Sequence, residues 1–316
     1  MKYQPPKIYL NSHFETIFPA LFRKVKFQPY IRERITTPDN DFLDLDWVKQ
    51  DAKKLVIISH GLEGNSEKPY VRGMGKAFYT AGFDVCAWNY RGCSGEVNKK
   101  LRFYHSGATD DLHSVVNHCL THDYDEIVLV GFSLGGNITL KYLGEQGSHV
   151  HKRIIKAIAI SVPVNLHTSC IKISKRGNMV YSKRFLRNLK AKIRKKAKIM
   201  PDKLDVNGLN SISTLIDFDN KYTAPIHGFK DAVDYYTQCS SLYHLDSIKC
   251  TTLIINAKND PFLSEDCYPV DQLKGHEFVT LEIPDYGGHV GFTEFNSEKM
   301  YWSEKRAVAF ATVTKG

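Results

Sequence analysis

The chain has 316 residues, a hydrophobic content of 42% and a formal net charge of +9 at pH 7. This length suits one large α/β domain with an insertion better than two independent domains. No segment offers the roughly 18 continuous apolar residues of a membrane helix. Residues 1–24 lack the features of a secretory signal, and the seven scattered cysteines include no C-x-x-C pair. We therefore expect a cytoplasmic protein without a disulfide framework or a metal site.

The positive charge is concentrated in one stretch. Residues 171–203 carry 13 Lys or Arg and a single acid, Asp202, so this stretch has a net charge of +12 and the rest of the chain about −3. No basic surface interleaved with aromatic residues and no known module indicates nucleic-acid binding. We expect a monomer.

Short apolar runs alternate with helix-length stretches along most of the chain. Segments 25–35 and 41–48 flank a turn at 37–40 and predict an antiparallel hairpin. The later runs predict parallel strands at 55–59, 83–88, 126–131, 154–162, 251–256 and 278–283, with crossover helices near 68–81, 107–121 and 134–146. This order predicts a mostly parallel sheet covered by helices on both faces.

The alternation stops after Pro163 and resumes near Cys250. We expect residues 1–165 and 249–316 to form the α/β core. Residues 166–248 are helix-prone and basic, and we expect them to form a cap over the carboxyl ends of the strands.

One cap segment, Ser182–Ile199, is amphipathic. Its apolar residues recur at intervals of four, with Lys and Arg around the remaining face: Phe185, Leu189, Ile193 and Ala197. One interpretation is a cap helix that packs this apolar stripe over the site while its cationic face is solvated. The other is peripheral contact with an anionic membrane or a phosphate-bearing lipid ester.

The motif G-x-S-x-G occurs at residues 131–135 and places Ser133 at its centre. It directly follows the predicted strand and precedes a helical run. A nucleophile elbow needs this order of strand, turn and helix, and the two glycines leave room for the tight turn. Ser133 is therefore the predicted nucleophile.

A serine hydroxyl needs a base and an acid that orients the base. Asp260 follows the strand predicted at 251–256, and His289 lies in a glycine-rich loop after the last strand. Open α/β sheets build their sites past the carboxyl ends of strands, so these two residues complete the predicted triad. Asp285 is the rival acid, but it lies only four residues before His289 in the same loop.

The developing oxyanion needs backbone donors. We predict the amide of Leu134, which follows the nucleophile, and the amide of Leu62, in the loop after the first parallel strand. His60 in that loop is interpreted as a residue that props the backbone.

Motifs along nearly the whole chain resemble the YheT-like branch of the α/β-hydrolases (AB hydrolase family 4). They are residues 59–64 (SHGLEG), 89–96 (NYRGCSGE), 104–107 (YHSG), 131–137 (GFSLGGN), 11–13 with 15–16, 218–219, 222–225 and 228–229. The resemblance implies an α/β-hydrolase fold and a cofactor-free, carboxylesterase-like or lipase-like enzyme. It implies a triad of Ser133, Asp260 and His289, and it supplies a reaction class without a particular substrate. We expect a small acyl ester or a lipid-like substrate. One departure is Glu15, where the family often has glutamine.

Other functions stay open at this stage. An acyltransferase or thioesterase would use the same acyl-enzyme, and a non-catalytic member would use the pocket to bind a ligand. The pattern H-x-x-x-x-D at His105 and Asp110 is associated with acyltransferases, but it recurs at His118 and Asp123 and so discriminates little. Arg91 is interpreted as a buried residue that holds loop carbonyls.

Overall fold

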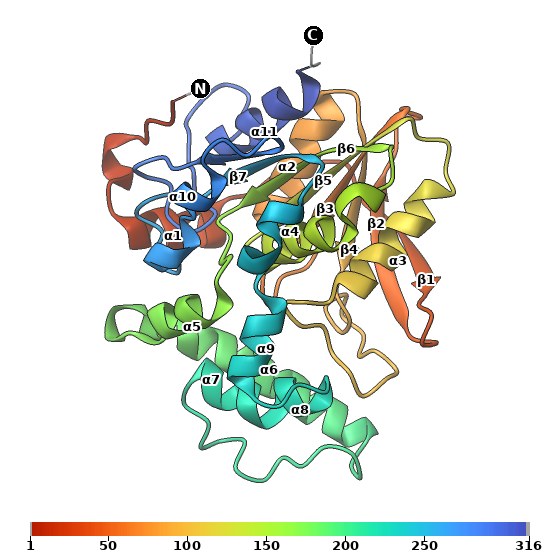
Figure 1. Cartoon of the computed structure of the whole chain (residues 1–316), viewed down its shortest axis with the longest axis vertical. Helices are drawn as coiled ribbons and strands as arrows, with labels where there is room; N and C mark the ends of the chain where they lie inside the picture. Colours follow the sequence, from red (N-terminus) through yellow and green to blue (C-terminus); the bar gives the residue numbers. More distant parts are fainter. Residues whose placement is uncertain (1, 314–316) are drawn as a thin grey trace.

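The computed structural model describes residues 2–313 (Figure 1). Its centre is an eight-stranded sheet with the order β1-β2-β4-β3-β5-β6-β7-β8. The strands are β1 Ile31–Thr36, β2 Phe42–Val48, β3 Lys54–Ser59, β4 Asp84–Asn89, β5 Glu126–Phe132, β6 Ile154–Ile160, β7 Thr251–Ile255 and β8 Val279–Glu282. β2 pairs antiparallel with β1 and β4, and the strands from β4 to β8 in this order are all parallel. The predicted hairpin and mostly parallel sheet are confirmed, although the first strand of the hairpin begins at Ile31.

Helices cover both faces of the sheet because successive side chains of the buried central strands point to opposite faces. In β3, Leu55 and Ile57 pack into the cluster under α3 (Thr109–Leu120), α4 (Leu134–Gln146) and α10 (Val270–Leu273). Val56 and Ile58 pack into the cluster under α2 (Pro69–Thr80) and α11 (Trp302–Thr312). The predicted α/β class, with a mostly parallel sheet covered by helices on both faces, is confirmed.

The segment between β6 and β7 is helical, and Figure 1 shows it beyond one end of the sheet. It contains α5 Leu166–Ser174, α6 Met179–Ile199, α7 Leu215–Phe218, a π-helical turn Asp219–Thr223, α8 Ala224–Ile226 and α9 Ala232–Cys239. It has its own apolar cluster, which includes Leu186, Ile193 and Tyr236. We propose that this segment is the cap.

The cationic face of α6 is not wholly solvated, contrary to the first interpretation. Lys196 is fully buried and its ammonium donates to Asn98 Oδ1 at 2.5 Å and to loop carbonyls. Lys192 pairs with Glu63 at 2.8 Å. A buried ammonium needs hydrogen-bonding partners. These two side chains find theirs in loops that follow strands of the sheet, and they thereby attach α6 to the core.

The structure also contains helices that the sequence analysis did not predict. Helix α1 (Ser12–Phe22) begins where the Asn11 side chain accepts the amides of His13 and Phe14. Short 3-10 helices lie at Lys7–Tyr9, Gly147–His149, Arg176–Asn178, Ser241–Ser247 and Glu265–Cys267.

Within residues 2–313, no helix has the length and apolar character to cross a membrane.

Candidate active site

Ser133 occupies a strained turn between β5 and α4. Its backbone has φ 53° and ψ −119°, a conformation that non-glycine residues rarely adopt. A Cβ at Gly131 would lie 2.4 Å from the carbonyl oxygen of Gly135, and a Cβ at Gly135 would lie 2.5 Å from that of His60. Both glycines of the motif are therefore required by backbone contacts on either side of the serine.

The structure brings Ser133, His289 and Asp260 together from three loops. His289 Nε2 lies 2.9 Å from Ser133 Oγ, and His289 Nδ1 lies 2.8 and 3.1 Å from the two Asp260 oxygens. Asp260 is 3% exposed. The rival acid Asp285 is exposed and no hydrogen bond within residues 2–313 joins it to His289. These distances suit proton transfer from Ser133 to an imidazole oriented by Asp260.

The loop of His289 is held by hydrogen bonds from distant segments. Thr16 Oγ1 accepts the amide of His289 at 2.9 Å, and Ser161 Oγ accepts the amide of Val290 at 2.9 Å. Val290 and Ser161 both have positive φ. Neither Thr16 nor Ser161 received a role from sequence.

Glu15 joins the histidine loop to the acid loop. A single carboxylate oxygen, Oε2, accepts the Asn259 side-chain amide at 2.6 Å and the Gly287 backbone amide at 3.1 Å. The other oxygen is buried without a hydrogen-bond partner within residues 2–313. Burial raises the pKa of Glu15. Residues 15–16 belong to a motif identified in the sequence, but the contacts of Glu15 with Asn259 and Gly287 join distant segments and have no signal in the local sequence.

Two tyrosine hydroxyls fix the loop that contains Leu62. Tyr70 accepts the amide of Gly61 at 2.9 Å, and Tyr104 accepts the amide of Glu63 at 3.0 Å while donating to the Glu63 carboxylate at 2.6 Å. Between these two anchored amides, the amide of Leu62 donates to no acceptor within residues 2–313. The same holds for the amide of Leu134, the first residue of α4.

His60 props this loop, as the sequence indicated. Its Nδ1 lies 2.8 Å from the Gly61 carbonyl oxygen, and its Nε2 accepts the Tyr90 amide at 3.3 Å. Complete burial lowers the pKa of His60 to about 3, so its imidazole is neutral at pH 7.

Two cavities meet at Ser133 and His289, and both are bounded by Leu62, Phe185 and Phe262. The first has a volume of about 140 Å³ and extends under the helical segment. Its mostly apolar wall includes Leu134, Leu166, Ile173, Leu189 and Leu215.

This first cavity also has a polar part at the π-helical turn. There Asp219 accepts hydrogen bonds from Thr223 and Tyr236, each at 2.5 Å. Burial raises the pKa of Asp219 to about 6.

The second cavity has a volume of about 180 Å³ and runs between α1 and α6. Its wall contains Ile17 and Ala20 of α1, Arg184 of α6 and Lys68 at the start of α2.

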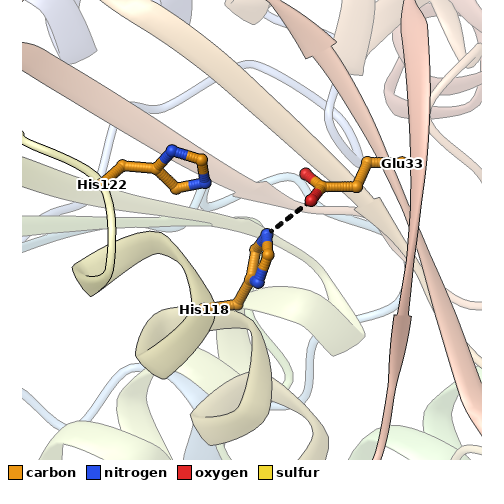
Figure 2. A group of neighbouring side chains, drawn as sticks. All are labelled: Glu33, His118 and His122. Carbon is orange, nitrogen blue, oxygen red and sulfur yellow. Dashed lines mark ion pairs between the residues drawn. The ribbon is translucent and has the colours of Figure 1, made fainter.

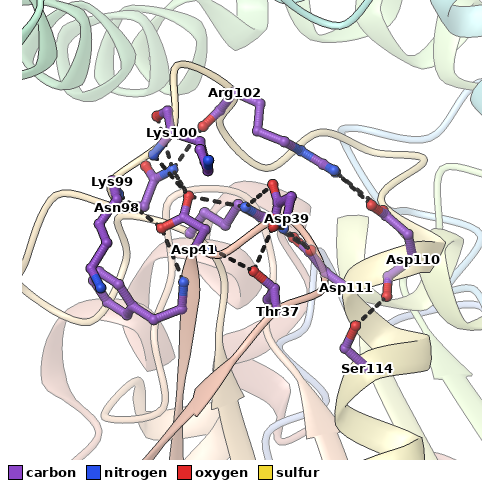
Figure 3. A network of polar contacts seen from close by, with 12 residues as sticks. Thr37, Asp39, Asp41, Asn98, Lys99, Lys100, Arg102, Asp110, Asp111 and Ser114 are labelled. Atoms are coloured by element: carbon purple, nitrogen blue, oxygen red, sulfur yellow. Dashed lines mark hydrogen bonds and ion pairs between the residues drawn. The ribbon is translucent and has the colours of Figure 1, made fainter.

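Arg91 corrects one prediction. It is buried as expected, but its guanidinium bonds three carboxylates and not loop carbonyls: Asp39 and Asp41 at 2.9 Å and Asp111 at 2.7 Å. Figure 3 shows these aspartates converging between the hairpin and α3. A buried, fully paired arginine has no charge left for a substrate anion.

The pattern of His105 and Asp110 does not form an acid–base pair. Asp110 is paired with Arg102 at 2.7 Å (Figure 3), whereas the His105 ring packs 4.6 Å from that of His227 and borders the first cavity.

A separate group of side chains has metal-binding chemistry. Ligand atoms of Glu33, His118 and His122 lie within 4.8 Å of one another, and His118 Nε2 lies 3.0 Å from the Glu33 carboxylate (Figure 2). Two imidazoles and a carboxylate suit zinc. The group lies on β1, on α3 and in the turn that follows α3, so it does not belong to the site around Ser133.

Comparison with known proteins agrees with the fold. Residues 54–295 match the family model described as the alpha/beta hydrolase fold. An esterase of Pyrococcus furiosus, Pf2001, superimposes with a TM-score of 0.60 at 18% identity, covering 98% of this chain and 96% of that one. The chain belongs to the α/β-hydrolase family.

The sequence relatives define the branch. An Escherichia coli protein named "Putative esterase YheT" is 36% identical over 91% of this chain and 86% of its own length. The monoacylglycerol lipase of Saccharomyces cerevisiae is 32% identical over 85% of this chain and 60% of its own length. The mouse phospholipase ABHD3 is 28% identical over 84% of this chain and 67% of its own length. The predicted YheT-like character is thereby confirmed.

Proposed function

We propose that this protein is a serine hydrolase that cleaves carboxylic esters through an acyl-enzyme. Ser133 Oγ attacks the ester carbonyl carbon while His289 Nε2 takes its proton, and Asp260 holds the Nδ1–H of the same ring. The amides of Leu62 and Leu134 stabilise the oxyanion. His289 then gives the proton to the departing alcohol. In the second half of the reaction, water attacks the acyl-enzyme while His289 takes its proton, and His289 returns that proton to Ser133 Oγ as the acid leaves.

One observation carries this proposal: the His289 ring bridges Ser133 and Asp260 with hydrogen-bond distances on both sides. The two unpaired amides beside Ser133 support the oxyanion role. Relatives named as an esterase, a monoacylglycerol lipase and a phospholipase support an enzyme that acts on esters.

The substrate we propose is a small acyl ester or a lipid ester. The mostly apolar first cavity suits the acyl chain, and the second cavity, which reaches Ser133 from the other side, suits the alcohol. No step of this mechanism needs a cofactor.

The alternatives have less support. An acyltransferase or thioesterase would share the acyl-enzyme. However, Asp110 is paired with Arg102 and not with His105, so the acyltransferase pattern gains no support from the structure. A purely ligand-binding protein would have no use for the aligned Ser133, His289 and Asp260.

Two further expectations belong with this proposal: a monomeric protein, and contact of the exposed cations of α6 with an anionic membrane. Lys183, Arg184 and Arg187 are exposed on this helix, which suits attraction to anionic lipid.

Hydrolysis of p-nitrophenyl esters tests the proposed function. Ser133→Ala should abolish turnover, and Asp260→Asn should lower kcat by roughly 10³ to 10⁴-fold because the imidazole loses its orienting anion. Asp285→Asn is the matched control and should leave kcat near that of the wild type. Unchanged turnover in Ser133→Ala would refute the proposal, and the opposite ranking of the two Asn variants would transfer the acid role to Asp285.

A further inference from the structure

Helix α1 packs its polar Glu15 and Thr16 inward and turns most of its large apolar side chains outward. Glu15, Thr16 and Pro19 are buried against the rest of the molecule, where Glu15 and Thr16 hold the histidine loop. Phe14, Ile17, Leu21 and Phe22, spaced as one face of a helix, are 37%, 36%, 59% and 63% exposed. An amphipathic helix of a globular protein normally has the reverse orientation.

The outward face continues beyond the helix. Ile8 and Leu10, just before α1, are 64% and 55% exposed, and Phe295 nearby is 68% exposed. The fully buried Tyr9 ring contacts two members of this surface, with its centroid 5.0 Å from that of Phe14 and 5.7 Å from that of Phe295. We call the set Ile8, Leu10, Phe14, Ile17, Leu21, Phe22 and Phe295 the α1 apolar face. A contiguous exposed apolar surface of this kind marks an interaction site.

The charges around the α1 apolar face favour one kind of partner. Lys7, Lys24 and Lys26 are exposed next to it in the sequence, and within residues 1–30 the sole acid is the buried Glu15. Near Phe295, Glu294 is paired with Lys305 at 2.8 Å, and Glu298 is exposed. An apolar face bordered by lysines suits an anionic lipid surface, where the apolar side chains enter the acyl boundary and the ammonium groups contact the headgroups. A second copy of the chain would instead bring the same cations together across a symmetric interface.

The second cavity connects this face to Ser133. Ile17 and Ala20 of α1 contribute to its wall, while Leu21 and Phe22 on the same helix lie outside it. The opposite wall includes Arg184 of α6, and His13 at the start of α1 lies 3.0 Å from the Tyr181 hydroxyl of α6. A surface that docks on α1 therefore lies against the helix that forms one wall of the cavity leading to Ser133.

We propose that α1 is an interfacial anchor that docks the protein on an anionic lipid surface and aligns the cavity between α1 and α6 with that surface. Docking by α1 goes beyond the proposed hydrolysis, because it requires neither Ser133 nor turnover.

Vesicle flotation tests the anchor. The probes are vesicles of phosphatidylcholine alone and of phosphatidylcholine with phosphatidylglycerol. The test variant replaces three strongly exposed residues that lie outside both cavities: Leu10→Ser, Leu21→Ser and Phe22→Ser together. The matched control replaces equally exposed apolar residues elsewhere: Ile31→Ser, Val233→Ser and Tyr243→Ser, which are 75%, 50% and 62% exposed in the wild type.

The wild type and the control should float with the anionic vesicles and more weakly with the neutral ones. The test variant should lose about tenfold or more in vesicle affinity, because each removed side chain forfeits apolar burial in the bilayer. Ser133→Ala should float like the wild type, which separates this result from any failure of the hydrolase proposal. Turnover of a short-chain p-nitrophenyl ester by the test variant should stay near the wild-type value and shows that it folds.

Three results would overturn the proposal. They are a wild type that floats with neither vesicle, a test variant that floats like the wild type, and a concentration-dependent dimer that the test variant abolishes while vesicle binding is absent. The last would identify the α1 apolar face as a contact between two copies.

Discussion

At the scale of single residues, two tyrosine hydroxyls deserve the first test because they fix the backbone on either side of Leu62. Tyr70 holds the amide of Gly61 and Tyr104 holds both the amide and the carboxylate of Glu63. An oxyanion donor contributes only when it is held in place before the reaction.

We therefore predict that Tyr70→Phe and Tyr104→Phe each lower kcat by about tenfold, the equivalent of one misaligned hydrogen bond. Steady-state kinetics on a p-nitrophenyl ester measure this, with the exposed Tyr243→Phe as control. A change confined to KM would mean that the two hydroxyls only shape the cavities, since Tyr104 borders the first cavity and Tyr70 borders the second.

At the scale of elements, α1 connects the amino-terminal segment to the loops of the proposed triad. Glu15 uses one oxygen for both of its hydrogen bonds. The carbonyl oxygen of a glutamine can accept the same two donors without a buried charge. A glutamine therefore fits the site chemically, whereas an alanine leaves the donors of Asn259 and Gly287 unpaired.

We predict that Glu15→Ala loses about 1–3 kcal/mol of unfolding free energy and much of kcat, while Glu15→Gln keeps kcat near that of the wild type. The pH dependence has a definite sign. Burial raises the pKa of Glu15 in the folded state, so that state binds the proton more tightly than the unfolded chain. Wild-type stability should consequently fall, relative to Glu15→Gln, as the pH rises through the raised pKa.

Urea unfolding of the three proteins between pH 4.5 and pH 8 measures this difference. A difference in unfolding free energy between the wild type and Glu15→Gln that stays constant across this pH range would contradict the raised pKa of Glu15. An alanine variant as stable as the wild type would remove the role of Glu15 altogether.

At the scale of the whole molecule, the first cavity forms where the α/β core meets the helices between β6 and β7. Ile173 of α5 is 7% exposed and borders this cavity, whereas Ile171 on the same helix is 43% exposed and does not. The pair allows the same substitution to be made inside and outside the proposed acyl site.

We predict that Ile173→Trp shifts the optimum of a p-nitrophenyl ester series toward shorter acyl chains. For the longest ester the loss in kcat/KM should be about tenfold or more, since each excluded methylene forfeits about 0.8 kcal/mol of burial. Ile171→Trp should keep the wild-type optimum. If both variants shift it equally, or neither does, the acyl chain lies elsewhere.

Much of this architecture follows from local sequence pattern. Ser133, Asp260 and His289 could be chosen because each follows a strand and parallel strands end at the same edge of a sheet. Their catalytic roles stay predictions, but the structure places the three side chains in contact. The predicted oxyanion donors also rest on sequence position, since Leu134 follows the nucleophile directly and Leu62 lies in the loop after the first parallel strand. Their role stays a prediction.

Other features have no local signal. Thr16 and Ser161 act on backbone amides more than 120 residues away along the chain, and such pairs have no spacing to detect. The apolar spacing of α1 would ordinarily predict a buried face. In the structure this face is exposed, because the opposite face carries Glu15 and Thr16, which accept hydrogen bonds from the buried loops of the site. Arg91 was correctly placed in the interior, but its aspartate partners come from separate segments and were missed.

Reaction with a fluorophosphonate probe, followed by intact mass and peptide mapping, tests the central claim most directly. We predict one probe per chain, attached to Ser133, with labelling lost in Ser133→Ala and greatly slowed in His289→Ala, both checked for native circular dichroism. A fluorophosphonate reacts far faster with a serine that a neighbouring base has activated than with an ordinary serine. Labelling that persists in Ser133→Ala, or that maps to another residue in the wild type, would contradict the assignment of Ser133 as the nucleophile.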